Sequence, residues 1–261
     1  MGTAGSFDEA PFLSVVIPAY REEKRLPATL EALPRELAAA GIASYEAVVV
    51  DDGSPDGTSE VARRAAEANP RIRVLRHDAN FGKGRAVRTG ALAARGEWVL
   101  VTDADASTPA SDVARLLAVG RRGVPVVVGS RRVKGAEIGV RQPLHREALG
   151  FAFAALRRLL VLPTVRDTQC GFKLFRADAA RALFEAARED GFVYDVEVLL
   201  LARQRGWQVV EVPVRWSDDP RTQVRALPAS ASMALGLLRL ALRRVAPAPS
   251  RADRPRVRRA P

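Results

Sequence analysis

Short apolar segments rich in β-branched residues alternate with longer stretches of helical periodicity through the first half of the chain. Apolar runs of this length, bounded by turn residues, are typical of buried strands. They predict strands over Leu13–Ile17, Tyr45–Val50, Ile72–Leu75, Trp98–Val101 and Val124–Val128. The periodic stretches predict helices over Arg25–Ala40, Ser59–Ala68, Arg85–Ala94 and Asp112–Val119. Pro34 falls inside the first helix, where a proline is expected to kink or end it.

This alternation predicts a Rossmann-like α/β fold with a mostly parallel sheet and helices on both faces. In such a sheet the carboxyl ends of the strands meet along one edge, where ligands bind. Polar residues follow every predicted strand and are expected to gather there: Tyr20, Glu22, Asp51, Asp52, Lys83, Asp103, Asp105 and Arg131. Helix capping alone does not explain so many clusters in register, so this edge is the predicted functional site.

Asp103 and Asp105, directly after the strand Trp98–Val101, give the clearest chemical signal. With one residue between them, the two carboxylates point the same way in an extended segment. Paired carboxylates favour a hard cation such as Mg²⁺ or Mn²⁺, whose other ligands include substrate phosphates. Taken alone, the same residues also fit an Asp-rich turn that caps a helix beginning near Pro109.

Gly82, Lys83 and Gly84 precede the helix Arg85–Ala94 and form a candidate anion site. Backbone N–H groups, the helix dipole and the Lys83 ammonium are expected to face an anion together. The spacing is not that of a P-loop, and no G-x-G-x-x-G follows the first strand, so a dinucleotide fold is not expected. Together with the Asp-x-Asp pair, this loop predicts a metal-chelated nucleoside diphosphate.

The 261 residues carry a net charge of +11, nearly all of it from arginine. This charge indicates an anionic partner such as nucleic acid, a membrane or a phosphorylated substrate, although a GC-rich genome gives the same bias. The acidic edge and the lack of a helix-turn-helix or RNP motif argue against nucleic acid. The single Cys170 excludes an internal disulfide and is compatible with a reducing compartment. No apolar run reaches the ~20 residues of a spanning helix.

The second half of the chain contains an amphipathic stretch over residues 145–162. It follows a loop expected over Lys134–Pro143 and mixes apolar residues with Arg146, Arg157 and Arg158. This composition predicts a helix in a membrane interface with its arginines at the headgroups, and a core helix is the alternative. Further elements are expected at Arg166–Arg176 (loop and strand), Asp178–Ala187 (helix), Val193–Gln204 (helix) and Trp207–Val214 (strand).

Ala226–Val245 is the second amphipathic candidate, with Leu235, Leu238 and Leu242 in one stripe. The expected organisation is an N-terminal tail, a catalytic domain, this helix and a basic disordered tail that binds anionic lipid or is simply solvated. Their boundaries are 1–11, 12–217, 218–245 and 246–261.

Six motifs together resemble the inverting glycosyltransferases of family 2, which have the GT-A fold: PAYREE, VVDDGSPDGT, NFGKGRAVRTG, DADASTP, GSRR and DTQCGFKLFR. VVDDGSPDGT and DADASTP mark the broad family. DTQCGFKLF, followed by FVYDVEVLLLA and VPVRWSD, is narrower and resembles the dolichyl-phosphate β-glucosyltransferases and their prokaryotic polyprenyl-phosphate relatives. The resemblance spans about Leu13 to Ser217. Arg21 departs from it, since the family usually has asparagine there.

The resemblance implies a role for each matching residue. The base, ribose and phosphates of a nucleotide sugar are expected to contact Pro18, Tyr20, Glu22, Asp52 and Lys83. Asp103 is expected to face the sugar or ribose, and the metal set is Asp105, Asp103 and Ser107. The phosphate of the acceptor, or the donor diphosphate, is assigned to Arg131, Arg146, Lys173 and Arg215. Because donor and acceptor are both anions, arginines are needed to suppress their repulsion.

Asp195 is predicted to belong to the catalytic set with Asp103, Asp105 and Arg131. A lipid-phosphate acceptor is already ionised at neutral pH and needs positioning more than deprotonation. Asp195 is therefore expected to orient Lys173, Arg215 or a sugar hydroxyl and not to act strictly as a base. Glu197 is the competing candidate.

The predicted activity is metal-dependent, inverting transfer of glucose from UDP-glucose to a polyprenyl or dolichyl phosphate. GDP-mannose as the donor, or a non-lipid acceptor, are the alternatives. Because the lipid lies in a bilayer, the protein is expected at the cytoplasmic face of a membrane, as a peripheral protein. The amphipathic helices and basic tail, or a separate membrane protein, are expected to hold it there.

Overall fold

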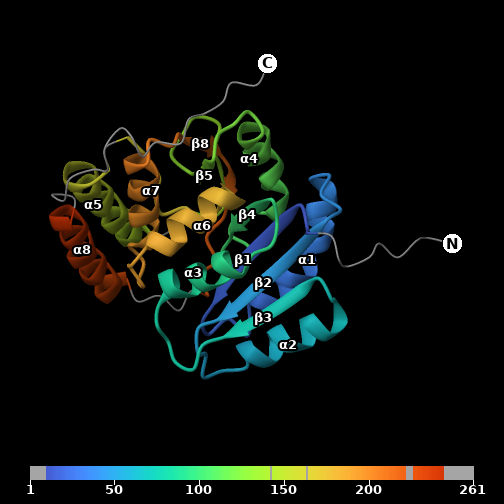
Figure 1. Ribbon diagram of the computed structural model, residues 1–261. Coiled ribbons are helices and arrows are strands. Elements are labelled where there is room, and N and C mark those ends of the chain that lie inside the picture. Colours follow the sequence, from blue (N-terminus) through green and yellow to red (C-terminus); the bar gives the residue numbers. More distant parts are fainter. Residues whose placement is uncertain (1–9, 142, 163, 222–225, 244–261) are drawn as a thin grey trace, which may run out of the picture.

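The computed structural model has a seven-stranded sheet at its centre, with helices on both faces (Figure 1). It describes residues 10–141, 143–162, 164–221 and 226–243, without the side chains of 144–147, 226–231 and 243. The predicted α/β class and mostly parallel sheet are confirmed.

The strands of the main sheet are β1 (Leu13–Ala19), β2 (Tyr45–Asp51), β3 (Ile72–Arg76), β4 (Trp98–Val101), β5 (Val126–Ser130), β7 (Lys173–Arg176) and β8 (Val209–Pro213). A small second sheet pairs β6 (Glu137–Ile138) with β9 (Arg215–Trp216) in parallel. The helices are α1 (Leu26–Ala39), α2 (Thr58–Ala68), α3 (Lys83–Ala93), α4 (Val113–Gly120), α5 (Leu144–Leu160), α6 (Ala177–Ala186), α7 (Tyr194–Gln204) and α8 (Ala226–Arg243). A short 3₁₀ helix, Ala110–Asp112, leads into α4.

The strand order is β3-β2-β1-β4-β7-β5-β8, and β7 runs antiparallel to both of its neighbours. The sequence predicted a strand here without its direction. Reversing β7 places its first residue, Lys173, opposite Val101, the last residue of β4. Lys173 therefore starts at the same edge where the parallel strands end, beside the Asp-x-Asp segment.

Two large apolar clusters cover the two faces of the sheet, as the alternation of side chains along a strand requires. Leu13, Val15 and Ile17 of β1 point to the cluster formed with α1, α2 and α4. Val16 points to the other cluster, which α3 and α5 to α8 share. The buried helix faces thereby hold the carboxyl edge of the sheet in a fixed position.

Two helices differ from their predicted course. α1 continues through Pro34, which faces solvent, so the carbonyl that loses its N–H partner has access to water. α3 begins at Lys83, before the predicted start, which places this ammonium in the first turn. The loop expected over Lys134–Pro143 contains the short strand β6.

α5 and α8 pack side by side at one end of the molecule (Figure 1). Phe153 and Leu156 of α5 pack against the core, whereas Phe151 is 63% exposed, so the helix has a core face and an outer face. The prediction that Arg157 faces a headgroup layer is wrong, because this side chain is only 1% exposed. None of the described helices is long and apolar enough to cross a bilayer.

Candidate active site

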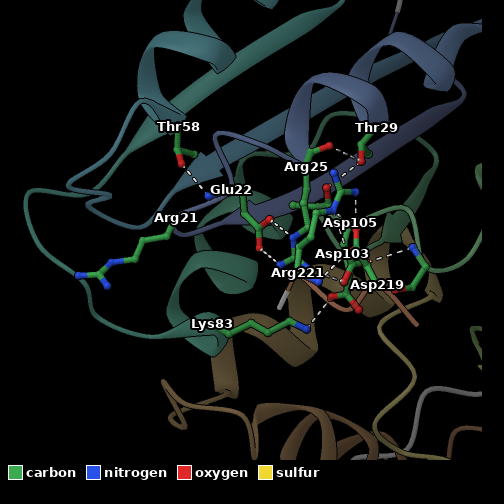
Figure 2. Close-up of polar contacts among 12 residues, drawn as sticks. Arg21, Glu22, Arg25, Thr29, Thr58, Lys83, Asp103, Asp105, Asp219 and Arg221 are labelled. Atoms are coloured by element: carbon green, nitrogen blue, oxygen red, sulfur yellow. Dashed lines mark hydrogen bonds and ion pairs between the residues drawn. The ribbon is translucent and has the colours of Figure 1, made fainter. Parts of the chain in front are cut away.

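Acidic and basic side chains alternate at the carboxyl edge of the sheet. Asp103 and Asp105 follow β4, and the Lys83 ammonium lies 2.6 Å from Oδ1 of Asp103 (Figure 2). Thr102 continues the β1–β4 register by donating its N–H to Val16, so both carboxylates leave a rigid strand end. The sequence thus predicted correctly which strand ends meet.

Arg25 links the first strand to the Asp-x-Asp segment, and the sequence analysis did not identify it. Its Nε donates to Glu22 at 2.7 Å and its Nη1 donates to Asp105 Oδ2 at 3.2 Å. The side chain is 7% exposed, so its charge acts in a dry environment. Glu22 and Arg25 are three residues apart at the start of α1, a spacing typical of helical ion pairs, which is the signal that was available.

The two carboxylates of the Asp-x-Asp pair have opposite pKa shifts. Burial opposes ionisation of Asp103, but the charges of Lys83, Lys173 and Arg131 outweigh it and lower the pKa of Asp103. Burial and the charge of Asp103 raise the pKa of Asp105. Asp105 therefore sits where an added positive charge has the largest effect.

These residues fit a divalent cation that is completed by substrate oxygens. Among the described residues no cluster of three or more His, Cys, Asp or Glu side chains is arranged around a metal position. Mg²⁺ sites in phosphate-handling enzymes, however, use one or two carboxylates plus substrate phosphates and water. Asp105 and Asp103 supply such a pair, and Ser107 fixes Asp105 by donating its backbone N–H at 3.0 Å.

A second buried group lies around the start of β7. Lys173 forms an ion pair with Asp195 of α7, and both side chains are almost fully buried. Burial raises the pKa of Asp195 despite the opposing charges of Lys173 and Lys83. Of the two side chains predicted as partners of Asp195, it contacts Lys173 and not Arg215, and its contact with a sugar hydroxyl stays a prediction. Glu197 instead accepts the N–H groups of Arg188 and Glu189 and so holds a loop.

Gly171 explains why a glycine stands in the DTQCGFKLF motif. A Cβ placed on Gly171 would lie 2.0 Å from Oδ2 of Asp103. Any side chain at this position would push Asp103 away from Lys83. The motif therefore shapes the site in two ways: the backbone at Gly171 lies against Asp103, and Lys173 pairs with Asp195.

Arg131, at the end of β5, is held by Asp167. The carboxylate of Asp167 accepts the backbone N–H, Nε and Nη2 of Arg131 at 2.8 to 2.9 Å. Burial opposes this charge, but Arg131 lowers the pKa of Asp167 to about 2. The guanidinium lies over the ring of Trp216, 5.2 Å from its centroid, and its charge acts on Asp103. Sequence reasoning found Arg131 and missed Asp167 and Trp216.

Several N–H groups of the loop before α3 and of the first turn of this helix have acceptors within the chain. The N–H groups of Phe81 and Gly82 donate to Asp52, at 3.1 and 2.7 Å, and Arg85 N–H donates to the carbonyl of Asp190. A Cβ on Gly82 would lie 2.5 Å from that carbonyl, so the glycine accommodates the chain's own backbone. The Lys83 ammonium lies at the carboxylates, and the anion site predicted at this loop stays a prediction.

Asp52 is 2% exposed and is occupied by protein donors, including His77 Nδ1 at 2.7 Å. Asp52 supports the neighbouring loop by accepting its N–H groups. Its contact with a base or ribose stays a prediction. Pro18 is buried within β1, and Tyr20 is half-buried just after it. The guanidinium of Arg21 lies over the Tyr20 ring and away from the carboxylates (Figure 2).

Arg21 has a φ of +57°, a region that asparagine enters more readily than most residues. This backbone conformation gives a physical reason for the asparagine that the family usually has at this position. Arg21 adopts it with its N–H donated to Ser54 Oγ at 3.1 Å.

Of the four residues assigned to the acceptor phosphate, one lies apart from the carboxylates and one has a side chain outside the described residues. The Arg215 guanidinium donates to Asp112 and Ser111, on the opposite side of β9 from Trp216. Arg146 lies in α5 among the residues whose side chains are not described. Lys173 and Arg131 are the two that the structure brings to the carboxylates.

Arg221, in the segment after β9, pairs with Asp219 and lies within electrostatic range of Asp105 and Glu22. Asp219 raises the pKa of Arg221, and Asp105 and Glu22 add to the effect. Ser217 N–H donates to the carbonyl of Ser107, which ties this segment to the Asp-x-Asp loop. The sequence offered no local signal for Arg221, because nearly all of the chain's positive charge is arginine.

A parallel sheet whose carboxyl edge carries an Asp-x-Asp pair surrounded by cations defines a class, the glycosyltransferases of the GT-A fold. Comparisons with known proteins identify the family. The model of glycosyl transferase family 2 matches residues 14–184, and the chain belongs to this family.

Relatives and solved structures agree with this assignment. A dolichyl-phosphate β-glucosyltransferase of Trichomonas vaginalis is 36% identical over 243 residues, which cover 88% of this chain and 71% of the relative. The human dolichyl-phosphate β-glucosyltransferase is 35% identical, with 79% and 67% covered. A Mycobacterium tuberculosis glucosyl-3-phosphoglycerate synthase, crystallised with Mn²⁺, UDP-glucose and phosphoglyceric acid, superposes with a TM-score of 0.62 at 19% identity, covering 90% of this chain and 79% of that one. At this identity the structural match supports the GT-A fold alone.

Proposed function

We propose that this glycosyltransferase moves glucose from UDP-glucose to a dolichyl or polyprenyl phosphate, with inversion at the anomeric carbon and with Mg²⁺ or Mn²⁺. The observation that carries the proposal is a site with cations on both sides of an Asp-x-Asp pair, in a chain similar over most of its length to dolichyl-phosphate β-glucosyltransferases. A donor diphosphate and an acceptor phosphate are both anions, and such a site accommodates both.

The donor half of the site is formed by Lys83, Asp105 and Asp103. Lys83 supplies an ammonium for the diphosphate, and its charge persists because Asp103 and Asp195 outweigh the effect of burial and raise its pKa. Asp105, with Asp103 beside it, would hold the metal. When bound, the metal neutralises the charge that develops on the departing diphosphate.

The acceptor half is formed by Arg131 and Lys173. An oxygen of the lipid phosphate attacks the anomeric carbon while the bond to the diphosphate breaks, so no proton has to be removed from the nucleophile. Arg131, fixed by Asp167, offers a guanidinium suited to a phosphate. Asp195, paired with Lys173, orients the acceptor side of the site and is not needed as a base.

A lipid acceptor requires the site to approach a membrane. We propose that α5 and α8 dock peripherally on the cytoplasmic face of a membrane. The exposed apolar side chains of these helices, which we call the membrane face, are Phe151, Leu159, Leu235, Leu238 and Leu242. Arg132, next to Arg131, lies over the Phe151 ring at 4.9 Å, so this face adjoins the acceptor half of the site.

The test is a lipid-extraction assay. The protein is incubated with polyprenyl phosphate, Mg²⁺ and one radiolabelled donor at a time: UDP-glucose, GDP-mannose or UDP-N-acetylglucosamine. Label in the lipid phase from UDP-glucose alone supports the proposal. Label in the lipid phase from GDP-mannose would show that the transferred sugar is mannose and not glucose. Transfer only to a soluble acceptor would overturn the lipid assignment.

A further inference from the structure

Arg157 is a buried arginine in α5 whose two Nη groups donate to backbone carbonyls, while its buried Nε has no hydrogen-bond partner among the described residues. Nη1 donates to the carbonyls of Leu162 and Val165, both at 2.6 Å, and Nη2 donates to that of Arg166 at 3.3 Å. These carbonyls belong to the turn that follows α5. The guanidinium therefore closes this turn from the helix side.

Glu211 of β8 holds the other edge of the same turn. Its carboxylate accepts the N–H of Arg166 at 2.7 Å and the N–H of Asp167 at 2.8 Å. A buried cation and a carboxylate from two separate elements thus fix Leu162 and Val165–Asp167, one through carbonyls and the other through N–H groups. We call this arrangement the clamp.

The clamp holds the position of Asp167, whose carboxylate accepts three hydrogen bonds from Arg131. Asp167 is 2% exposed and comes directly after the last carbonyl that Arg157 binds. A shift of this turn would move the Asp167 carboxylate and, with it, the plane of the Arg131 guanidinium. Arg157 is thereby linked to the site through a continuous series of hydrogen bonds.

Packing does not by itself account for an arginine at this position. Burying a guanidinium is unfavourable unless its donors are satisfied, and an apolar side chain fills a core position without that cost. None of the ion pairs among the described residues includes Arg157, so its charge is balanced by the carbonyl dipoles it contacts and, without direct contact, by the carboxylates of Glu211 and Asp167. What the arginine adds over an apolar residue is a defined conformation of the turn.

We propose that Arg157 is a positioning residue that sets the orientation of Arg131 through the clamp, and so couples the helix carrying the membrane face to the acceptor half of the site. The inference rests on the proposed function for the choice of assay. The hydrogen-bond series itself is independent of the sugar or acceptor.

The decisive experiment compares Arg157→Met in the wild type and in an Arg131→Met background. In the wild type we expect kcat/KM for polyprenyl phosphate to fall by about a hundredfold, the scale of a small displacement at a reacting centre. The KM for UDP-glucose is expected to stay near the wild-type value. In the Arg131→Met background the same substitution is expected to cause no further loss. Equal losses in both backgrounds would overturn the proposal, because Arg157 would then act independently of Arg131.

Matched variants separate positioning from stability. Arg181→Met removes an exposed arginine of α6 and is expected to leave the kinetics unchanged, whereas Leu37→Ala lowers stability from the other face of the sheet. If Leu37→Ala, at an equal loss of Tm, reproduced the acceptor-specific defect, the role of Arg157 would be structural only. Arg157→Lys, which keeps a charged donor, is expected to restore part of the activity. If Arg157→Met does not fold, Arg157→Lys is compared in the wild-type and Arg131→Met backgrounds instead. A full loss of activity in Arg157→Lys that is equal in both backgrounds would contradict the proposal.

Hydrogen exchange tests the clamp without catalysis. In Arg157→Met or Arg157→Lys, the amides of Arg166, Asp167 and Arg131 are expected to exchange faster, while those of β1 and β2 remain protected. Unchanged protection at 166 and 167 would show that Glu211 holds the turn alone. If the wild type transfers no sugar but the exchange pattern appears as expected, the proposed function fails and the clamp stands.

Discussion

Asp105 occupies a position in the site where its negative charge is unfavourable, since burial and Asp103 both raise its pKa. Asp105→Ala is expected to abolish turnover and to weaken UDP binding strongly in Mg²⁺ or Mn²⁺, because the diphosphate loses its bridge to the protein. Isothermal titration with UDP and the lipid-extraction assay measure the two effects. Asp178→Ala, an exposed aspartate of α6, is the control. Near-normal turnover of Asp105→Ala would remove this residue from the metal set.

Lys83 supplies the charged group of the loop before α3, where the N–H groups of Phe81 and Gly82 already donate to Asp52. Lys83→Met is expected to weaken UDP binding by about 1.5–3 kcal/mol, the range for a charged hydrogen bond. Uridine, which has no phosphate, is expected to bind almost as it does to the wild type. Equal losses for both ligands would mean that the substitution acts through Asp103 or the fold.

Asp167 makes a pH-dependent contribution to stability. Its pKa is lowered from 3.8 to about 2 in the folded protein, so the folded state binds this proton less readily than the unfolded state. The contribution, about 2 kcal/mol at most, is present above pH 4 and is lost as the pH falls toward 2. Urea unfolding between pH 5 and pH 2.5 is expected to show a shallower pH dependence for Asp167→Asn than for the wild type. Parallel curves would contradict the assigned shift.

Site residues whose place follows from the local order of strands and helices lie where they were predicted to lie. The side chains that pair with site residues from distant parts of the sequence were not predictable. Asp103 and Asp105 follow a strand, and Lys83 starts a helix, so local rules locate them. The pairing of Arg131 with Asp167 spans 36 residues, and that of Arg25 with Asp105 spans 80. Such contacts depend on how β7 and α1 pack, which no local pattern encodes.

At the scale of elements, α5 shows what a periodic pattern leaves open. Its alternation of apolar and basic residues fits an interfacial helix and a core helix equally well. The structure gives it both faces, with Phe153 packed inward and Phe151 outward. Neighbouring arginines divide in the same way, since Arg157 is buried and Arg158 is exposed.

This division predicts different outcomes for two phenylalanines of α5. Phe151→Ser is expected to reduce binding to lipid vesicles while Tm stays within a few degrees of the wild type, since its ring is largely exposed. Phe153→Ser is expected to lower the free energy of unfolding by about 2–4 kcal/mol, as removal of a packed aromatic ring does. Vesicle flotation and thermal unfolding of both variants provide the measurements. Loss of Tm in Phe151→Ser without a change in flotation would assign this residue to the core.

At the scale of the whole molecule, the order of strands and helices predicted the edge at which the site lies. The antiparallel insertion of β7 was not predictable, because strand direction is set by the length and course of the connections before and after it. That insertion brings Lys173 and Gly171 against the Asp-x-Asp loop. The second half of the chain thus completes a site whose donor half comes from the first half.

The membrane face and the chain's charge of +11 together predict how the whole protein associates with lipid. Burial of exposed leucine and phenylalanine surface contributes about 25 cal/mol per Å². Each arginine near an anionic surface adds about 1 kcal/mol, and this component is screened by salt. The protein is therefore expected to float with anionic vesicles at low ionic strength, to float poorly with neutral vesicles, and to be released in part by high salt.

Leu238→Ser combined with Leu242→Ser is expected to weaken flotation at every salt concentration, because both side chains are at least half exposed on α8. Arg64→Ser on α2, far from this helix in the fold, is the control for charge (Figure 1). If the wild type fails to float on anionic vesicles at low salt, the membrane face does not suffice, and a separate membrane protein must bring the site to its lipid. Equal flotation on both vesicle types at every salt concentration would instead show that apolar contact alone holds the protein, and the arginines would then serve the site and not the surface.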